Sequence, residues 1–532
     1  MMLRQEKLTL GVIIISLVFS ACFPSKRVTL LKREVITPGL RIKSPTKAFL
    51  MDASFLLFPY GFSVVNDTIR GVGTRYWLDH ADLESKPYTI PLDSIGAMSY
   101  YDLKSSPGSL LGSTLLGLYG GFITAYSIEC ITCPKCCFGS CPTLYTHDGK
   151  EYKLEAELFS YSLSKFFQEN DLDRLSQKIP QNGLYQVRVS NEALETHYIN
   201  ELSLITVSHQ IGTKLFPSDK GGFIATTTLQ PPIEAVNSLG EDVFNLLHSR
   251  DDRWYRSDTN MVRKLAEGVY SDWVDLKLKL PEKATNVKLV LHLRNTLLST
   301  ILLYDVVLAS QGIAALEWTE RMNKDLLYAS QYHAIYNSYS GMDIKVYRNG
   351  KWIQQASLKD VGPIAGKDVA VELAASKDAE GIMRVRLEFF PDNIMIDYVA
   401  FEANNSLKEA LLVDKILPTE IYDHTGQKRD DILELIEKSD NQFLITSPGE
   451  SYYFNYNIPP SERMEKTVFV QSKGYYTEWI RGEWLMPRSA GYQFDLLRVD
   501  ETIAQLRQSW LANRGLIESE FFKTKIPLGE GL

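Results

Sequence analysis

One order of sequence motifs occurs twice in this chain of 532 residues. Gly149 and Gly350 each follow an alternating run with a polar turn, and Gly183 and Gly381 each open the pattern Gly-x-x-x-Val-Arg. Three more pairs follow in the same order: Tyr198-Ile-Asn-Glu-Leu-Ser-Leu with Met395-Ile-Asp-Tyr-Val-Ala-Phe, Asp242-Val-Phe-Asn-Leu-Leu with Asp431-Ile-Leu-Glu-Leu-Ile, and Leu276-Lys-Leu-Lys-Leu-Pro with Phe454-Asn-Tyr-Asn-Ile-Pro. Because chance does not preserve such an order, we infer two tandem copies of one module, in 142–300 and 342–480.

Each copy consists of short alternating strands, turn residues and one short apolar run of helical character. This pattern predicts a two-sheet antiparallel sandwich. Asp242 and Asp431 open the helical runs, so we expect helix N-caps there, while Trp254 and Phe443 are expected to fill the cores. Residues 301–341 show helical spacing and predict a connector between the sandwiches. A tail, 481–532, contains one more predicted helix.

The region 33–104 predicts a separate small β domain, either a barrel or a roll. A tight turn at Asn66-Asp67 lies between β-branched residues, which is typical of a hairpin. The predicted fold class is therefore mainly β: this small domain, one apolar helix, and two tandem sandwiches.

The apolar helix is predicted in 105–129, where no charge lies between Lys104 and Glu129. Small residues recur there at every fourth position and would form one ridge on a helix: Ser109, Ser113, Gly117, Gly121 and Ala125. Such a ridge lets a second backbone approach closely, which favours helix self-association and a homo-oligomer. Three interpretations fit the segment: a transmembrane helix, a helix buried against the protein, and an interfacial helix.

Cysteines crowd into the next segment, 130–141: Cys130, Cys133, Cys136, Cys137 and Cys141. Disulfides in an oxidising compartment are the favoured interpretation. Because the number of cysteines is odd, one thiol would then stay free or pair with another chain. The spacing misses the ferredoxin pattern by one residue, and paired zinc knuckles usually have a longer insert. Structural zinc, an iron cluster and plain reduced thiols stay as alternatives, and no metal site is assigned.

Charge and motif content narrow the function classes. The net charge of −8 comes without a basic stripe that could neutralise phosphates, which argues against nucleic acid. We find no nucleophile elbow, no His-Glu-x-x-His and no phosphate-binding Gly-rich loop, so no catalytic residue and no cofactor are assigned. A catalytic pair of carboxylates, as in glycosidases, stays an alternative, because 65 acidic residues offer many such pairs.

The amino-terminal segment 1–22 has the layout of an export signal. The uncharged run from Leu8 to Phe19 is of signal-peptide length and too short to span a bilayer. Leu17-Val-Phe-Ser-Ala-Cys22 resembles the lipobox of bacterial lipoproteins, which implies lipidation at Cys22. The resemblance also implies the outer membrane, because no Asp follows the cysteine, with the inner membrane as the alternative. An ordinary signal peptide or an uncleaved anchor would be the other interpretations.

Two further resemblances bear on function. The phrases at Ile199 and Ile396 resemble the closing strand of jelly-roll sugar-binding modules. The whole layout, including the phrase Cys141-Pro-Thr-Leu-Tyr-Thr-His-Asp-Gly, resembles a group of bacterial envelope proteins with no assigned activity. We therefore expect a lipid-anchored envelope protein that binds or scaffolds polysaccharide or another envelope protein. An envelope polysaccharide hydrolase and a structural assembly subunit are the alternatives, and a non-enzymatic role is favoured.

Overall fold

The computed structural model describes residues 27–31, 36–43, 46–50, 54–58, 61–76, 86–102 and 141–478, the last with gaps at 194, 265–268, 309–314, 404–410, 448 and 462, and then 510–511 and 514–521. Its architecture is mainly β, as predicted, and all sheets are built from antiparallel ladders. The lipidation candidate Cys22, the small-residue ridge within 105–129 and four of the clustered cysteines lie outside the described residues. No helix in the described ranges is long and apolar enough to cross a membrane.

The small β domain is a roll whose described strands follow an open path, so the roll is the correct choice of the two predicted forms. Its order is β1-β8-β3-β4-β6-β5-β2, with β7 on β6. The turn at Asn66-Asp67 joins β5 and β6 with positive φ at both residues, as a two-residue hairpin requires. The strands are β1 (Arg27–Leu31), β2 (Arg41–Ile42), β3 (Thr46–Leu50), β4 (Phe55–Phe58), β5 (Phe62–Val65), β6 (Thr68–Tyr76), β7 (Lys86–Pro91) and β8 (Ile95–Asp102), with the short helix η2 (Leu92–Ser94) before β8.

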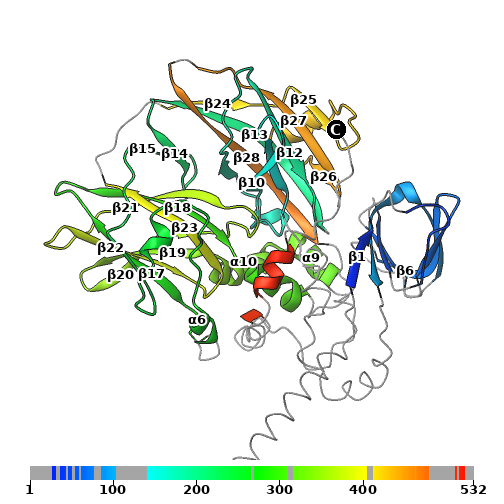
Figure 1. The fold of residues 1–532 in the computed structure, drawn as a ribbon, viewed down its shortest axis with the longest axis horizontal. Helices are drawn as coiled ribbons and strands as arrows, with labels where there is room; N and C mark the ends of the chain where they lie inside the picture. Colours follow the sequence, from blue (N-terminus) through cyan, green and yellow to red (C-terminus); the bar gives the residue numbers. More distant parts are fainter. Residues whose placement is uncertain are drawn as a thin grey trace, which may run out of the picture.

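The first sandwich combines strands from 143–209 with strands from 412–478 (Figure 1). One sheet has the order β10 (Tyr152–Glu157), β9 (Thr143–His147), β12 (Leu184–Ser190), β27 (Ser451–Asn457) and β25 (Glu420–Asp423). The other has the order β11 (Asp171–Arg174), β28 (Glu465–Glu478), β13 (Glu195–His209) and β24 (Leu412–Ile416), with β26 (Leu444–Thr446) on β13. Apolar residues of both sheets form one core, which includes Tyr185, Leu202, Phe454 and Val470.

The second sandwich is contiguous in sequence. One sheet has the order β16 (Glu234–Asn237), β17 (Asp272–Lys279), β22 (Ile382–Phe389), β19 (Met342–Arg348) and β20 (Lys351–Leu358). The other has the order β21 (Lys367–Ala374), β18 (Asn286–Asn295) and β23 (Ile394–Glu402), and the hairpin β14 (Lys214–Pro217) and β15 (Phe223–Thr226) lies beside β21. The alternation of β17 is visible in its burial, because every second side chain is buried in the core.

The strand orders of the two sandwiches match element by element. The sheet β10-β9-β12-β27-β25 corresponds to β20-β19-β22-β17-β16, and β11-β28-β13 corresponds to β21-β18-β23. The motif pairs found in the sequence fall on these equivalent strands. The contiguous ranges 142–300 and 342–480 are nevertheless wrong as sandwich boundaries, because the copies exchange halves. The first half of copy 1 pairs with the second half of copy 2, and the remaining halves form the second sandwich.

Individual contacts support this equivalence. Gly183 and Gly381 both have φ near +75°, and their carbonyls accept hydrogen bonds from Ile458 N (2.8 Å) and Leu280 N (3.0 Å), respectively. Asn200 Oδ1 accepts from Asp440 N at 2.9 Å, and at the matching place Asp397 Oδ1 accepts from Asp251 N at 3.3 Å. Matching strands thus have matching neighbours, although their partners lie in different copies.

Short helices join the sandwiches and cover their ends. The helical part of the predicted connector contains α7 (Leu298–Ile301), the π-helix η5 (Leu302–Leu308), α9 (Ala315–Lys324) and α10 (Leu326–Ser340). Figure 1 shows α9 and α10 near the junction of the two sandwiches. Single-turn helices lie elsewhere: η3 (Lys165–Phe167), α5 (Phe244–Leu247), α6 (Thr259–Lys264) and α11 (Ile432–Ile436).

The tail docks on the second sandwich through a buried carboxylate. Residues 510–511 and 514–521 are helical, and the Trp510 side chain is fully buried. Asp392, also fully buried, accepts hydrogen bonds from Trp510 Nε1 (2.7 Å), Arg514 Nη1 (2.8 Å) and both Nε and Nη2 of Arg256 (2.9 and 3.0 Å). A buried charge with this many donors fixes the position of the tail helix.

Candidate functional site

A cleft of about 220 Å³ lies where the two sandwiches meet. The first sandwich contributes residues of β10, β11 and the loop after β11, and the second contributes the loop after α5, His292 of β18 and the start of β21. The lining residues are Leu154, Glu155, Asp173, Arg174, Ser176, Arg250, Asp252, Trp254, His292, Ile364, Ala365, Gly366, Lys367 and Asp368. The volume is below the usual range for drug-sized ligands, so the cleft suits one small ring rather than a large cofactor.

Asp368 is the electrostatic centre of the cleft. Its carboxylate lies 2.7 Å from His292 Nδ1 on the neighbouring strand and accepts from Arg250 (3.1 Å) and from Arg174 of the first sandwich (3.1 Å). Burial raises the pKa of Asp368, but the hydrogen bond with His292 and the charge of Arg250 outweigh burial and lower the pKa to about 2. The carboxylate is therefore ionised at neutral pH and binds the two sandwiches together.

A second charged group surrounds Lys367. Its ammonium lies 2.5 Å from Asp171 Oδ1 and 3.0 Å from Asp173 Oδ1, and both carboxylates belong to β11 of the first sandwich. Burial raises the pKa of Asp173 to about 7, against the opposing charge of Lys367. The other oxygen of Asp173, Oδ2, is buried and has no hydrogen-bond partner among the described residues. An unsatisfied buried acceptor at the wall of a cleft is a place where a ligand donor would be stabilised.

Trp254 forms the aromatic part of the wall. Its half-buried ring lies 5.3 Å from the His292 ring, and the Arg294 guanidinium lies 5.3 Å from the Trp254 ring centroid. Gly366 makes this arrangement possible, because a Cβ at that position would overlap His292 Nε2 and lie 3.0 Å from the Trp254 ring. The expectation that Trp254 fills a core is therefore wrong: the residue lines the cleft. Its counterpart Phe443 is also half-buried and packs on Tyr198 and Tyr475.

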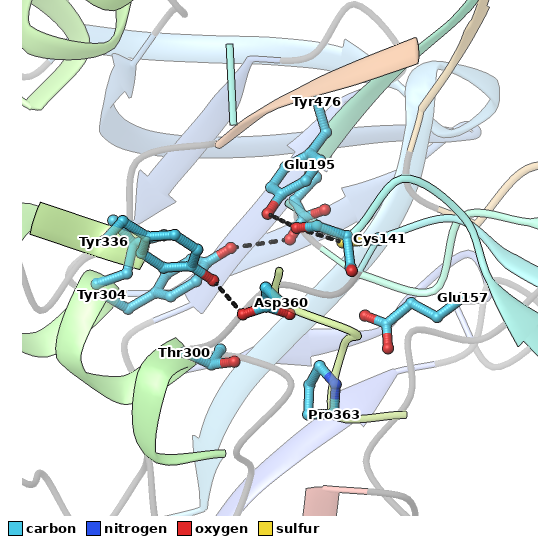
Figure 2. Close-up of a pocket in the computed structure, with 11 residues that line it drawn as sticks. Cys141, Glu157, Glu195, Thr300, Tyr304, Tyr336, Asp360, Pro363 and Tyr476 are labelled. Atoms are coloured by element: carbon cyan, nitrogen blue, oxygen red, sulfur yellow. Dashed lines mark hydrogen bonds between the residues drawn. The ribbon is translucent and has the colours of Figure 1, made fainter. Parts of the chain in front are cut away.

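A second, much smaller cavity lies where the connector helices meet the first sandwich. Figure 2 shows Tyr336 bonded to Asp360 (2.6 Å) and Tyr304 bonded to Glu195 (2.9 Å). The volume of about 20 Å³ has room for about one water molecule, so this cavity is a packed polar junction and not a substrate site. Glu195, at the start of β13, and Asp392, just before β23, occupy matching positions in the two sandwiches. Glu195 binds Tyr304 of η5, and Asp392 binds Trp510 of the tail helix.

The junction and the cleft share one loop, between β20 and β21. Within this loop Ile364 N donates to Glu157 Oε2 of the first sandwich at 2.8 Å, and Asp360 accepts from Gly362 N at 2.7 Å. The same loop continues into Lys367 and Asp368. The contacts in the junction therefore determine where the charged residues of the cleft lie.

Cys141 is the one clustered cysteine within the described residues. It is a buried free thiol, and its Sγ–H donates to the Ser160 carbonyl at 3.5 Å. Burial raises the pKa of the Cys141 thiol, with a further contribution from Glu157. In this structure Cys141 is thus not in a disulfide. Among the described residues there is no group of three or more His, Cys, Asp and Glu side chains that could hold a metal ion.

The two predicted N-cap residues differ. Asp242 Oδ1 accepts from Phe244 N, the first residue of α5, at 2.9 Å, although the N-cap position itself is held by Val243. Asp431 occupies the N-cap position of α11, but its carboxylate forms a two-point ion pair with Arg429 (2.9 and 2.7 Å) and makes no cap bond, so the expected position is confirmed and the expected capping contact is wrong.

The cleft residues Asp173, Lys367, His292 and Asp368 carry no signal in the sequence. Neither copy alone contains the cleft, because β11 of copy 1 lies beside β21 of copy 2. No known protein-family model matches the chain, and no curated protein is significantly similar to it.

Proposed function

We propose that this protein is a lipid-anchored envelope protein whose cleft between the sandwiches binds a saccharide. The observation that carries the binding proposal is the half-buried Trp254 beside a buried acceptor without a partner, Asp173 Oδ2. A pyranose presents C–H groups on its faces, which pack on an aromatic ring, and hydroxyls on its edge, which both donate and accept. The cleft offers both kinds of surface.

The polar groups of the cleft suit hydroxyls. Arg174 Nε is buried without a partner among the described residues, so the cleft has an unsatisfied donor as well as an unsatisfied acceptor. A ligand hydroxyl satisfies either kind of group. Because the ion pairs of Asp368 and Lys367 already fix these side chains, little rotamer entropy is lost on binding.

Calorimetry with envelope polysaccharide fragments tests the binding proposal, after a glycan array has selected the fragments. We expect Trp254→Ala to weaken binding at least tenfold. Trp273→Ala is the matched control, because Trp273 is also half-buried and packed by an arginine, Arg386, but does not line the cleft. If both variants bind like the wild type, the cleft is not the saccharide site. If no glycan binds and a protein partner co-purifies, the assembly-subunit alternative is supported instead.

The anchoring proposal rests on the sequence at Cys22. Radiolabelled palmitate should enter the wild-type chain in cells and should not enter Cys22→Ser. Equal labelling of both chains, or no labelling of the wild type, would contradict it.

A polysaccharide hydrolase is the second candidate, because one observation favours it. Two carboxyl groups of one cleft, Asp173 and Asp368, have pKa values shifted in opposite directions, to about 7 and about 2. Such a pair is typical of a general acid beside an ionised carboxylate. Release of reducing ends from a bound glycan by the wild type, and its loss in Asp173→Asn with binding kept, would establish hydrolysis. Binding without turnover would exclude it for that glycan.

A further inference from the structure

Carboxylates outnumber arginine and lysine side chains in the lining of the cleft. Arg174, Arg250 and Lys367 face Glu155, Asp173, Asp252 and Asp368, and Asp171 joins them through its ion pair with Lys367. Arg294 packs on the far edge of this group, on the Trp254 ring, and donates to the carbonyls of Asn295 and Pro363. With Arg294 included and the His292 imidazole counted as neutral, the ionised cleft keeps an excess of one negative charge, which favours a cationic ligand over an anionic one.

The excess is concentrated on β11. Asp171 and Asp173 are two residues apart on this strand, so their side chains point to the same face. Both are about 95% buried, and they share a single ammonium, that of Lys367. One positive charge cannot neutralise two buried carboxylates. The remaining negative charge must take up a proton or a cation from outside the protein.

Asp173 is the member of the pair that can reach a ligand. It lines the cleft, whereas Asp171 uses its second oxygen to accept from Phe159 N at 2.8 Å. Asp173 Oδ1 is occupied by Lys367, and Oδ2 has no partner among the described residues. A ligand donor that reaches Oδ2 from the cleft would meet a buried acceptor on a carboxylate that Lys367 already holds in place.

We propose that the saccharide bound in this cleft carries a primary ammonium group, as an amino sugar with an unacetylated amine does, and that this ammonium binds Asp173. The inference rests on the proposed saccharide-binding function and names its ligand class. The ammonium donates to Oδ2 and balances the second carboxylate, while the sugar ring packs on Trp254. Charge-assisted hydrogen bonds of this kind are among the strongest in proteins when they are desolvated.

Proton release is a direct consequence. The raised pKa of Asp173 means that this carboxyl is partly protonated near neutral pH in the free protein. An ammonium placed at Oδ2 favours the ionised form, so binding expels the proton to solvent. The other groups that face Asp173 are Lys367, Asp171 and Asp368, and all three are engaged in ion pairs.

The experiment compares glucosamine oligomers with N-acetylglucosamine oligomers of equal length by calorimetry at about pH 5.5, where the amine is already protonated before it binds and the Asp173 carboxyl still holds its proton. Runs in buffers with different ionisation enthalpies measure the protons released. We expect the free amine to bind at least about tenfold more tightly and to release protons, while the acetylated oligomer releases none. Asp173→Asn should remove both differences and keep the weaker, acetylated mode of binding. Asp252→Asn is the control, because it removes one acidic group from an exposed position of the same cleft.

The outcomes separate the two proposals. Equal affinity for both oligomers in the wild type overturns the ammonium proposal and leaves saccharide binding intact. Equal losses in Asp173→Asn and Asp252→Asn overturn it too, because general charge would then explain the preference. If neither oligomer nor any other glycan binds, the proposed function itself fails. Putrescine that binds as tightly as the glucosamine oligomer would show a site for amines and not for amino sugars. Proton release by the wild type is measured without any variant, so a folding defect in Asp173→Asn does not remove the test.

Discussion

Gly362→Ala should loosen the junction that positions the cleft. Gly362 has φ +80°, a conformation that L side chains rarely adopt, and a Cβ there would overlap Glu157 Oε2. That oxygen accepts the hydrogen bond from Ile364 N, so the methyl group would displace a buried carboxylate from a backbone donor. Both the conformation and the contact therefore oppose the substitution.

The two effects can be separated in magnitude. Left-handed backbone at a residue with a Cβ costs about 1–2 kcal/mol, and an unsatisfied buried hydrogen-bonding group costs about 1–3 kcal/mol. We expect a loss of roughly 2–5 kcal/mol in the free energy of unfolding of the second sandwich. Gly350→Ala is the control, because Gly350 has φ +81° and a Cβ at that position would have no atom within 4 Å. Gly350→Ala should therefore lose only the free energy that the left-handed backbone conformation costs.

Urea denaturation followed by tryptophan fluorescence measures the free energy of unfolding of both variants, and both substitutions lie in the second sandwich. The difference between them should be about 1–3 kcal/mol, the contribution of the displaced Glu157 carboxylate. Gly362→Ala should also weaken saccharide binding, because its loop continues into Lys367 and Asp368. Equal destabilisation by the two substitutions would refute the reasoning, since the contact with Glu157 would then contribute nothing.

Three further outcomes follow from buried groups. The folded-state pKa of Asp173, about 7, lies above its ordinary value of 3.8, so the folded state holds this proton more tightly than the unfolded state does. The bound proton therefore stabilises the fold at low pH, and this stabilisation should be lost as the pH rises from about 4 to about 7. In Asp173→Asn the urea midpoint should not show this decrease with pH. Asp392→Ala leaves Arg514 and Trp510 without their acceptor and Arg256 with Glu518 alone, so we expect a loss of about 3–5 kcal/mol and faster proteolysis of the tail. Unchanged cleavage would count against a docked tail. Cys141 should resist iodoacetamide in the native protein and react after denaturation, and rapid native labelling would show that its burial is wrong.

The strands of the sandwiches were largely predictable from alternation and from the repeated motifs. Gly183 and Gly381 were matched in sequence, and they make the same hydrogen bond in the two sandwiches. What the motifs could not decide is which halves pair. When two copies have equivalent strands, a half can pair with its own copy or with the other, and local propensity is the same in both arrangements. The exchange is therefore a tertiary property.

The same reason explains why the cleft was missed. Asp173 and Lys367 are separated by most of the second sandwich in sequence, and neither lies in a motif. Trp254 was noticed as an aromatic shared by both copies, but its burial depends on Gly366, whose position beside it is set by the β20–β21 loop. Asp431 shows the limit of local interpretation, since Arg429 competes for its carboxylate.

The nested arrangement also determines the order in which the molecule can be completed during synthesis. Strands β9 to β13 of the first sandwich follow the small β domain out of the ribosome, yet their partners β24 to β28 come only after the whole second sandwich has been made. Until then the early strands present open edges, which are exposed to wrong pairing with other chains. A nascent chain that stalls before residue 412 would thus contain the finished small β domain, the finished second sandwich and a half-built first sandwich.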